Sequence, residues 1–151
     1  MSLSLKTIEI AVKQLGVQEI PKGSNSGPEV EIYLKSVGLG KGYSWCMAFV
    51  YWCVQRAAEQ TGSINPLKKT GGVLAQYNAK PELRQNVPEP GSIFILDFGK
   101  GLGHTGIVEK ILPNGFIQTL EGNTNTDGSR EGYAVCRRKR EVNSCKGFLK
   151  L

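Results

Sequence analysis

The chain has 151 residues, of which 40% are hydrophobic, so residues 1–151 are expected to form one domain with a substantial core. Its formal net charge of +6 favours an anionic partner, and no apolar run approaches the roughly 20 residues that a membrane-spanning helix needs. Four cysteines are too few for a disulfide-dense scaffold of this length.

Helical patterns fill the first half of the chain. Apolar residues recur at spacings of three and four before Gly16, which predicts an amphipathic helix over residues 5–15. A second helix is predicted over residues 28–37, because Pro28 suits a first helical turn and Gly38 suits a helix end. The apolar stripes of the two helices are Leu5, Ile8, Val12 and Leu15, and Val30, Tyr33, Leu34 and Val37.

The most apolar segment, YSWCMAFVYWC, spans residues 43–53. It predicts a third helix over residues 45–59 that is apolar on every side at its start, so this helix is expected to be central and buried. Arg56 and Glu59 mark the part that reaches solvent. Residues 71–79 are compatible with a short fourth helix.

The second half of the chain changes to shorter β-branched and aromatic runs separated by Gly, Pro and Asn. These runs predict strands over residues 92–98, 106–112, 115–122, 132–140 and 147–151. The Pro-Asn-Gly sequence at 113–115 is a strong hairpin signal. Helices followed by strands predict an α+β domain in which an antiparallel sheet of five or six strands packs on the N-terminal helices.

Cys46 lies at the front edge of the third predicted helix. The first amide hydrogens of a helix have no internal partner and carry a partial positive charge, which favours a thiolate, so a nucleophilic cysteine belongs there. Cys53, two turns further along, is expected to be an inert buried hydrophobe. Cys136 and Cys145 could pair across the last two strands or both stay free.

His104 is the only histidine, so it is the one imidazole that could exchange a proton with Cys46. It is expected to open the second strand, beside glycines such as Gly103 that let a substrate approach the backbone closely. The next strand ends in Glu121-Gly122-Asn123, and Glu121 or Asn123 could accept a hydrogen bond from the far nitrogen of His104. Cys, His, and then Glu or Asn is the chain order of the catalytic residues that a papain-like mechanism requires.

These blocks resemble the CHAP family of peptidoglycan amidases and endopeptidases, relatives of the NlpC/P60 peptidases in the papain-like group. The resemblance runs from residue 16 to the C-terminus and is carried by the block around Cys46, by GHTGIVEKI and by FIQTLEGNT. It implies a papain-like fold with Cys46 as nucleophile and His104 as general base and then acid. It also implies that Glu121 and Asn123 orient His104.

Two departures from the family pattern concern the neighbourhood of Cys46. Many members place glutamine before the nucleophile, where this chain has Trp45. The resemblance makes the backbone N–H of Cys46 one oxyanion donor, and Tyr43 and Ser44 are the candidates for the second. The acidic cluster that binds calcium in some phage members is missing from residues 38–45, so we expect no such metal and no cofactor.

Two short motifs are set aside. Residues 101–106 match a dinucleotide fingerprint in letters, but a β-branched run and a turn follow in place of the required helix. Residues 123–128 resemble the front of a calcium loop, yet Ala134 stands where a glutamate is needed, and we interpret them as a polar loop on the substrate side. One histidine and no closely paired cysteines argue against a zinc site.

The basic run at residues 137–140, Arg-Arg-Lys-Arg, has two interpretations. It is either the solvated end of a strand, whose charges protect a sheet edge, or a patch that attracts anionic wall polymer or nucleic acid. The run lacks adjacent stacking aromatics, which disfavours nucleic acid.

Residues and resemblance together predict a monomeric cysteine hydrolase that cuts peptidoglycan amide bonds through a thioacyl-enzyme. The bond would be that of an N-acetylmuramoyl-L-alanine amidase, or one within the stem peptide or cross-bridge. The alternative is a non-catalytic basic module of the same fold that binds wall polymer or nucleic acid, and a third possibility is the same chemistry on a protein or a small amide.

The site of action is expected to be the cell wall. The N-terminus shows no signal-peptide pattern, so we expect synthesis in the cytoplasm and release by lysis or by dedicated secretion.

Overall fold

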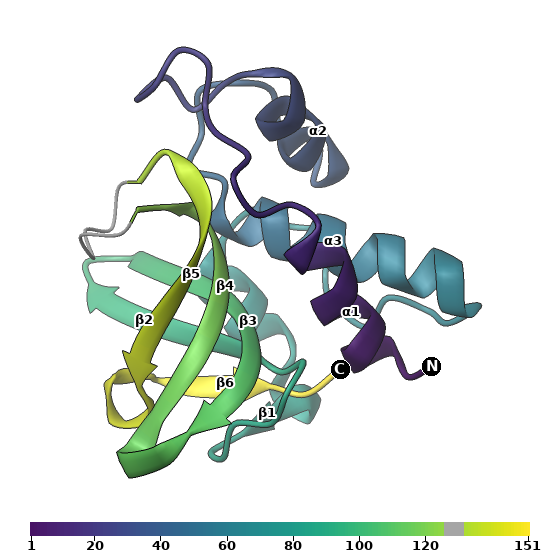
Figure 1. The fold of residues 1–151 in the computed structure, drawn as a ribbon, viewed down its shortest axis with the longest axis vertical. Coiled ribbons are helices and arrows are strands. Elements are labelled where there is room, and N and C mark those ends of the chain that lie inside the picture. The colour runs from purple at the N-terminus through teal and green to yellow at the C-terminus, as the bar shows by residue number, and fades with distance from the viewer. Residues whose placement is uncertain (126–131) are drawn as a thin grey trace.

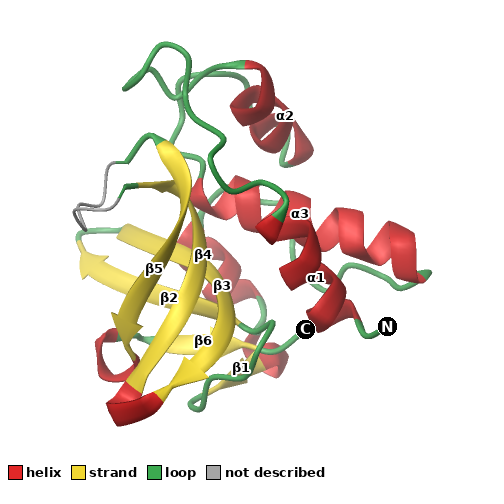
Figure 2. Ribbon diagram, viewed as in Figure 1, coloured by secondary structure: helices red, strands yellow, loops and turns green. Residues whose placement is uncertain are grey.

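A computed structural model describes residues 1–125 and 132–151. These residues form two layers, with helices on one side and a six-stranded antiparallel sheet on the other (Figures 1 and 2), so the predicted α+β class and helix-then-strand order are confirmed. The helices are α1 (Leu3–Val12), α2 (Pro28–Ser36), α3 (Cys46–Thr61) and α4 (Val73–Ala79). The strands are β1 (Arg84–Gln85), β2 (Ile93–Gly99), β3 (Leu102–Leu112), β4 (Phe116–Thr124), β5 (Ala134–Glu141) and β6 (Gly147–Leu149).

The central helix is α3, as predicted. Its first half is apolar on every side, and Met47, Phe49 and Val50 are completely enclosed between the sheet and the other helices. Towards its end the helix reaches solvent, where Arg56 and Glu59 form an exposed ion pair at 3.3 Å. Burial of the first half therefore fixes the end of α3 that carries Cys46.

The predicted first helix is present as α1, but one of the residues expected on its buried face is exposed. Leu5 is exposed, and the helix ends at Val12. The side chain of Ser2 accepts the Leu5 N–H at 3.2 Å, so the helix starts earlier than the apolar pattern indicated. Thr7 is buried because its hydroxyl donates to a carbonyl one turn back, at 2.8 Å.

The strands are arranged in the order β1-β6-β2-β3-β4-β5, and every pair is antiparallel. The predicted hairpin between β3 and β4 is confirmed, with Asn114 at φ 64° and Gly115 at φ 81° in its turn. The two-residue strand β1 was not predicted, because its pairing with β6 leaves no periodic signal in so short a run. In Figure 1, β6 returns to lie between β1 and β2.

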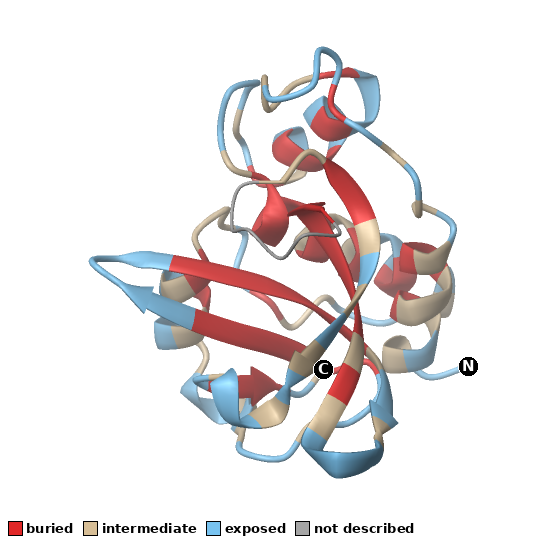
Figure 3. Cartoon of the chain, turned by 60° about the vertical axis from the view of Figure 1, so that its left-hand side comes forward, coloured by how far each residue is buried: buried red, intermediate tan, exposed pale blue. Residues whose placement is uncertain are grey.

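The two faces of the sheet carry separate hydrophobic clusters because side chains alternate along each strand. One cluster joins the sheet to the helices and includes Ile95, Ile107 and Leu120. The second lies on the other face and consists of Phe94, Leu96, Val108, Ile117 and Phe148. Figure 3 shows that the β2–β3 hairpin is buried at its base and exposed at its tip.

The N-terminal segment that follows α1 runs along the outer edge of β5. Gly16 N–H donates to the Val135 carbonyl at 3.1 Å, and Val135 N–H donates to the Val17 carbonyl at 2.9 Å. Gln18 forms an isolated antiparallel bridge with Ala134. Residues 16–18 thus cover the start of the edge strand β5, although the two segments lie far apart in the sequence.

Within the described ranges, none of the helices is both long and apolar enough to cross a membrane.

Candidate active site

Cys46 is the first residue of α3 and is 4% exposed. The residue before it, Trp45, occupies the N-cap position, and its side chain makes no capping hydrogen bond to the described residues. The first amides of α3 therefore point beyond the helix end without a capping side chain, and their partial positive charge acts on Cys46. Close packing holds this end in place, since a Cβ on Gly122 would lie 2.7 Å from the Cβ of Phe49.

His104 is buried in β3, two residues inside the strand. The expectation that it opens the strand was wrong, because a tight turn at Lys100 (φ 57°) and Gly101 (φ 76°) lets β3 begin at Leu102. His104 pairs with Leu96 in the ladder, which places it on the face of the second hydrophobic cluster. Its ring centroid lies 6.1 Å from that of Phe94.

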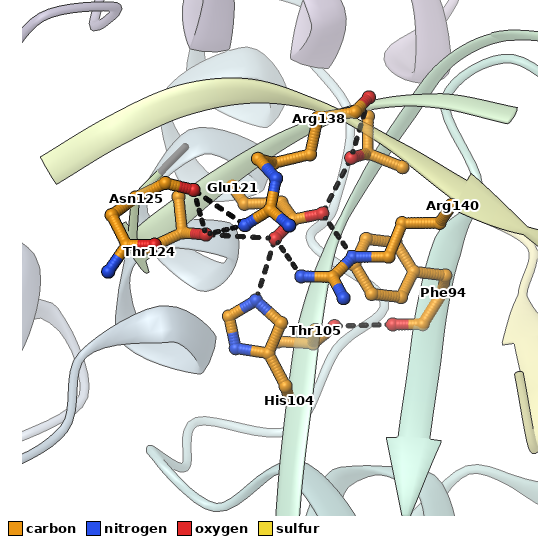
Figure 4. Close-up of polar contacts among 9 residues, drawn as sticks. Phe94, His104, Thr105, Glu121, Thr124, Asn125, Arg138 and Arg140 are labelled. Carbon is orange, nitrogen blue, oxygen red and sulfur yellow. Dashed lines mark hydrogen bonds and ion pairs between the residues drawn. The ribbon is translucent and has the colours of Figure 1, made fainter. Parts of the chain in front are cut away.

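Of the two predicted partners, the structure brings Glu121 to the imidazole. Nε2 of His104 lies 2.8 Å from Oε1 of Glu121, and both side chains are buried (Figure 4). This bond engages Nε2 and leaves Nδ1 as the ring nitrogen available to Cys46. Nδ1 itself is buried and makes no hydrogen bond of good geometry to the described residues.

The pKa of His104 is raised to about 9. Burial alone lowers this pKa, but interactions with Cys46 and with Glu121 outweigh it and favour the imidazolium. Cys46 therefore acts electrostatically on the ring, and no hydrogen bond joins its sulfur to Nδ1. The pairing of the Cys46 sulfur with the single imidazole stays a prediction that this interaction supports.

Glu121 is the most heavily bonded side chain of the site. Besides His104, its carboxylate accepts Nη2 of Arg140 at 2.7 Å, Nε of Arg140 at 2.8 Å and the Thr119 hydroxyl at 2.6 Å. Burial raises the pKa of Glu121, but Arg140 and His104 outweigh burial and lower this pKa to about 2. The carboxylate is therefore ionised over the whole physiological range.

Asn123 lies beside this network without joining it. It is buried at an irregular point of β4 with φ 55°, and its backbone carbonyl accepts the N–H of Gly132 at 3.2 Å. Within residues 1–125 and 132–151 its Oδ1 has no hydrogen-bond partner, and its side chain makes no hydrogen bond to His104. The sequence treated Glu121 and Asn123 as equivalent, whereas the structure separates them.

The predicted oxyanion and substrate residues have different surroundings. The indole N–H of Trp45 donates to Oε2 of Glu19 at 2.8 Å, and its ring stacks on Tyr33, so this side chain is committed to the core. Tyr43 is 56% exposed and Ser44 is half-buried. Gly103 is buried, and a Cβ on it would lie 2.9 Å from the Leu96 carbonyl oxygen and 3.1 Å from Val73.

Two residues of this region were missed by sequence reasoning. Glu19 is 3% exposed and accepts the Gly23 N–H at 2.8 Å as well as the Trp45 indole. Arg140 was placed in a basic run that was either a solvated strand end or an anion-binding patch, but strand alternation turns Arg138 and Arg140 inward and leaves Arg137 and Lys139 exposed. A period-two pattern on β5 would have indicated this division of the basic run.

The cysteines other than Cys46 are also free thiols. Cys53 is completely buried, and burial raises its pKa well above the ordinary value, as befits an inert hydrophobe. Cys136 and Cys145, whose pairing was left open, are not bonded to each other.

The proposed polar loop at 123–128 extends into residues 126–128, which lie outside the described residues. In the part of the chain that is described, no three or more His, Cys, Asp or Glu side chains cluster as a metal site would require.

A family model for the CHAP domain matches residues 38–123, which is more than half of the chain. The matched range contains Cys46, His104, Glu121 and Asn123, whereas Glu19 and Arg140 lie outside it. No curated protein matches the sequence.

The Glu19–Trp45 bond predicts a selective loss of stability. Trp45→Phe keeps the buried ring but removes the donor and leaves a buried carboxylate oxygen unpaired, which should lower the free energy of unfolding by about 1–3 kcal/mol. Trp52→Phe is the matched control, because it makes the same change on α3 at a half-buried side chain with no recorded hydrogen bond among the described residues. Urea unfolding of both variants measures the difference, and equal losses would contradict the role of Glu19.

The raised pKa of His104 predicts how stability depends on pH. Between the ordinary value of 6.5 and about 9, the folded chain holds a proton that the unfolded chain releases. The free energy of unfolding should therefore be highest below pH 6.5 and fall as pH rises through 9. His104→Asn removes this group, so its stability curve should be flatter over that interval. Chemical unfolding across the interval checks this, and parallel curves would show that His104 has no raised pKa.

Proposed function

Because the chain belongs to the CHAP domain family, we propose that it is a cysteine hydrolase that cuts amide bonds in bacterial peptidoglycan. The family indicates a peptidoglycan hydrolase acting at the cell wall, and the roles of individual residues are our proposal. The observation that carries it is the position of His104, whose Nε2 is held by Glu121 while its proton affinity also responds to Cys46.

The first half of the proposed reaction forms a thioacyl-enzyme. In the reacting form the proton of the Cys46 thiol lies on His104, because the raised pKa of His104 favours the imidazolium, and the sulfur attacks the carbonyl carbon of the scissile amide. Negative charge moves to the carbonyl oxygen, where the backbone N–H of Cys46 at the head of α3 stabilises it. Collapse of this intermediate breaks the C–N bond, and the imidazolium returns its proton to the leaving amine.

The second half releases the product. His104 takes a proton from water, which attacks the thioester carbon, and the new tetrahedral intermediate collapses to a carboxylic acid and the free thiol of Cys46. Glu121 stays ionised throughout and stabilises each imidazolium that forms. In the structure His104 Nδ1 has no hydrogen-bond partner among the described residues, and catalytic hydrogen bonds commonly form only when substrate tightens the site.

Asn123 and the residues before Cys46 are assigned to the substrate side. Asn123 Oδ1 is buried without a partner in the described chain, so an N–H of the bound substrate is a suitable donor to it. Tyr43 and Ser44 are the candidates for the second oxyanion donor, because the indole N–H of Trp45 already donates to Glu19.

Two identities of the scissile bond fit this chemistry equally. One is the amide between N-acetylmuramic acid and L-alanine, and the other is a peptide bond of the stem or cross-bridge. Mass spectrometry of fragments released from purified sacculi distinguishes them through the new termini.

The competing hypothesis is a non-catalytic module that binds wall polymer or nucleic acid through its basic surface. The basic run on β5 is weaker evidence for such a module than the sequence indicated. Arg140 is turned inward to Glu121, and Arg137 is paired with Glu109 at 2.8 Å. A binding module has no need of a cysteine, an imidazole and a buried carboxylate arranged in series.

Replacement of the nucleophile is the direct test of the enzyme assignment. Cys46→Ala should abolish the release of soluble fragments from sacculi, because the remaining groups supply no nucleophile. Cys53→Ala, two turns along the same helix, should keep the activity and serves as the control. Wild-type rates in Cys46→Ala would remove the basis of the proposal.

Alkylation of Cys46 in the wild-type chain distinguishes an enzyme from a binding module and needs no substrate. An activated Cys46 should react with iodoacetamide at mildly acidic pH, where an ordinary thiol, with a pKa near 8.5, reacts slowly. His104→Asn should lose this reactivity. Equal, slow alkylation of the two proteins would favour the binding module.

A further inference from the structure

Arg140 lies outside the matched family region and touches neither Cys46 nor His104 through any recorded bond, yet it shares a carboxylate with the imidazole. We propose that Arg140 is a positioning residue: its guanidinium keeps Glu121 ionised and turned towards His104, and thereby sets the proton affinity of the imidazole. Only the effect of this residue on hydrolysis rests on the proposed function.

The contact between Arg140 and Glu121 has the geometry of a fork. Nε donates to Oε2 at 2.8 Å and Nη2 donates to Oε1 at 2.7 Å, so both carboxylate oxygens are held by one planar group. Oε1 is also the oxygen that meets His104 Nε2 at 2.8 Å. A rotation of the carboxylate would break both bonds to Arg140 at once, so the fork fixes the direction in which Oε1 points.

The surroundings of Arg140 make this contact strong. Its side chain is 14% exposed, that of Glu121 is fully buried, and the guanidinium carbon lies 5.7 Å from the centre of the Phe94 ring. Phe94 is also the aromatic neighbour of His104, so the same buried ring borders the cation and the imidazole (Figure 4). Little water reaches the pair, and the charges act on each other with little screening.

A buried carboxylate needs such a cation. Without one, desolvation raises the pKa of a carboxyl group, so the His104–Glu121 pair would hold its proton more tightly. The hydroxyl of Thr119 donates to Oε2 but carries no charge. Against the effect of burial, the hydrogen bonding of Arg140 is the largest single cause that lowers the pKa of Glu121.

The charged and titratable neighbours of this group come from several elements. Around His104 they are Cys46 of α3 and Glu121 of β4, with Arg140 of β5 beyond the carboxylate. Cys136 of β5 and Cys145 after it act on Glu121 and Arg140 from further out. Arg140 is thus the cation of this set that is bonded to Glu121.

The effect of removing Arg140 has a definite sign. The proton shared by His104 and Glu121 is repelled by the guanidinium, whichever of the two residues holds it. Arg140→Gln removes that repulsion, so the pair should hold its proton to higher pH. A purely structural role for Arg140 would lower activity or stability and would leave this proton affinity where it was.

The chain offers a matched control on the same strand. Arg137 makes an equivalent fork to Glu109, at 2.8 Å and 2.9 Å, but it is exposed and lies on the opposite face of β5. Arg137→Gln therefore breaks the same kind of ion pair away from the imidazole. Arg140→Lys is the third variant, because it keeps the positive charge and loses the planar fork.

The experiment follows the single histidine by NMR with ¹⁵N-labelled imidazole across pH, which requires no substrate. We expect the His104 titration midpoint to rise by about one pH unit in Arg140→Gln, the scale expected for loss of a nearby charge, and to stay at the wild-type value in Arg137→Gln and Arg140→Lys. Fragment release by Arg140→Lys should fall on the order of 10-fold or more in kcat with KM unchanged, because the carboxylate is no longer held in one orientation.

A midpoint in Arg140→Gln equal to that of Arg137→Gln would overturn the proposal. If Arg140→Gln does not fold, Arg140→Lys decides: wild-type kcat in that variant would overturn the positioning role. The titration also separates this inference from the proposed function. A wild-type chain without hydrolase activity refutes the function alone, whereas an unmoved midpoint refutes the role of Arg140 alone.

Discussion

The hydrogen bond between His104 and Glu121 is the contact on which the rest of the site depends. It is 2.8 Å long, both partners are buried, and it fixes which ring nitrogen is left to face Cys46. Burying an imidazolium or a carboxylate alone would be costly, so the pair exists only because each charge is compensated. Glu121 is compensated from one side by His104 and from the other by Arg140. The result is a line of alternating charges that leads from the edge strand β5 towards the head of α3.

The fold supplies this line from distant parts of the chain. The helices come first and deliver Cys46 on a helix end held by the packing of Phe49 and Trp45 against Gly122. The strands come second and deliver His104, Glu121 and Arg140 on three neighbouring strands of one sheet. Residues outside the matched CHAP region contribute at both ends, since Glu19 binds the indole of Trp45 and Arg140 binds Glu121. A family match confined to residues 38–123 therefore leaves out the buried Glu19 and the partly buried Arg140, which hold Trp45 and Glu121.

Much of this architecture follows from local patterns in the sequence. The apolar run after Cys46 predicted the buried helix, and the turn at 113–115 predicted the hairpin that joins β3 to β4. Contacts between distant residues were beyond such patterns. The choice of Glu121 over Asn123 depends on an irregularity in β4, where Asn123 takes φ 55° and turns out of the strand alternation. The inward turn of Arg140 depends on the register of β5 against β4, and the partner of Trp45 lies 26 residues earlier in the chain. The two-residue strand β1 exists only through its pairing with β6.

The most direct measurement of the central claim is an NMR titration of His104 in the wild-type chain and in Cys46→Ala. The chain has one histidine, so the ring signals need no further assignment. The account predicts a midpoint near 9 in the wild type and a lower midpoint in Cys46→Ala, because Cys46 is one of the two groups that raise this pKa. A wild-type midpoint near the ordinary 6.5, unchanged when Cys46 is replaced, would contradict it.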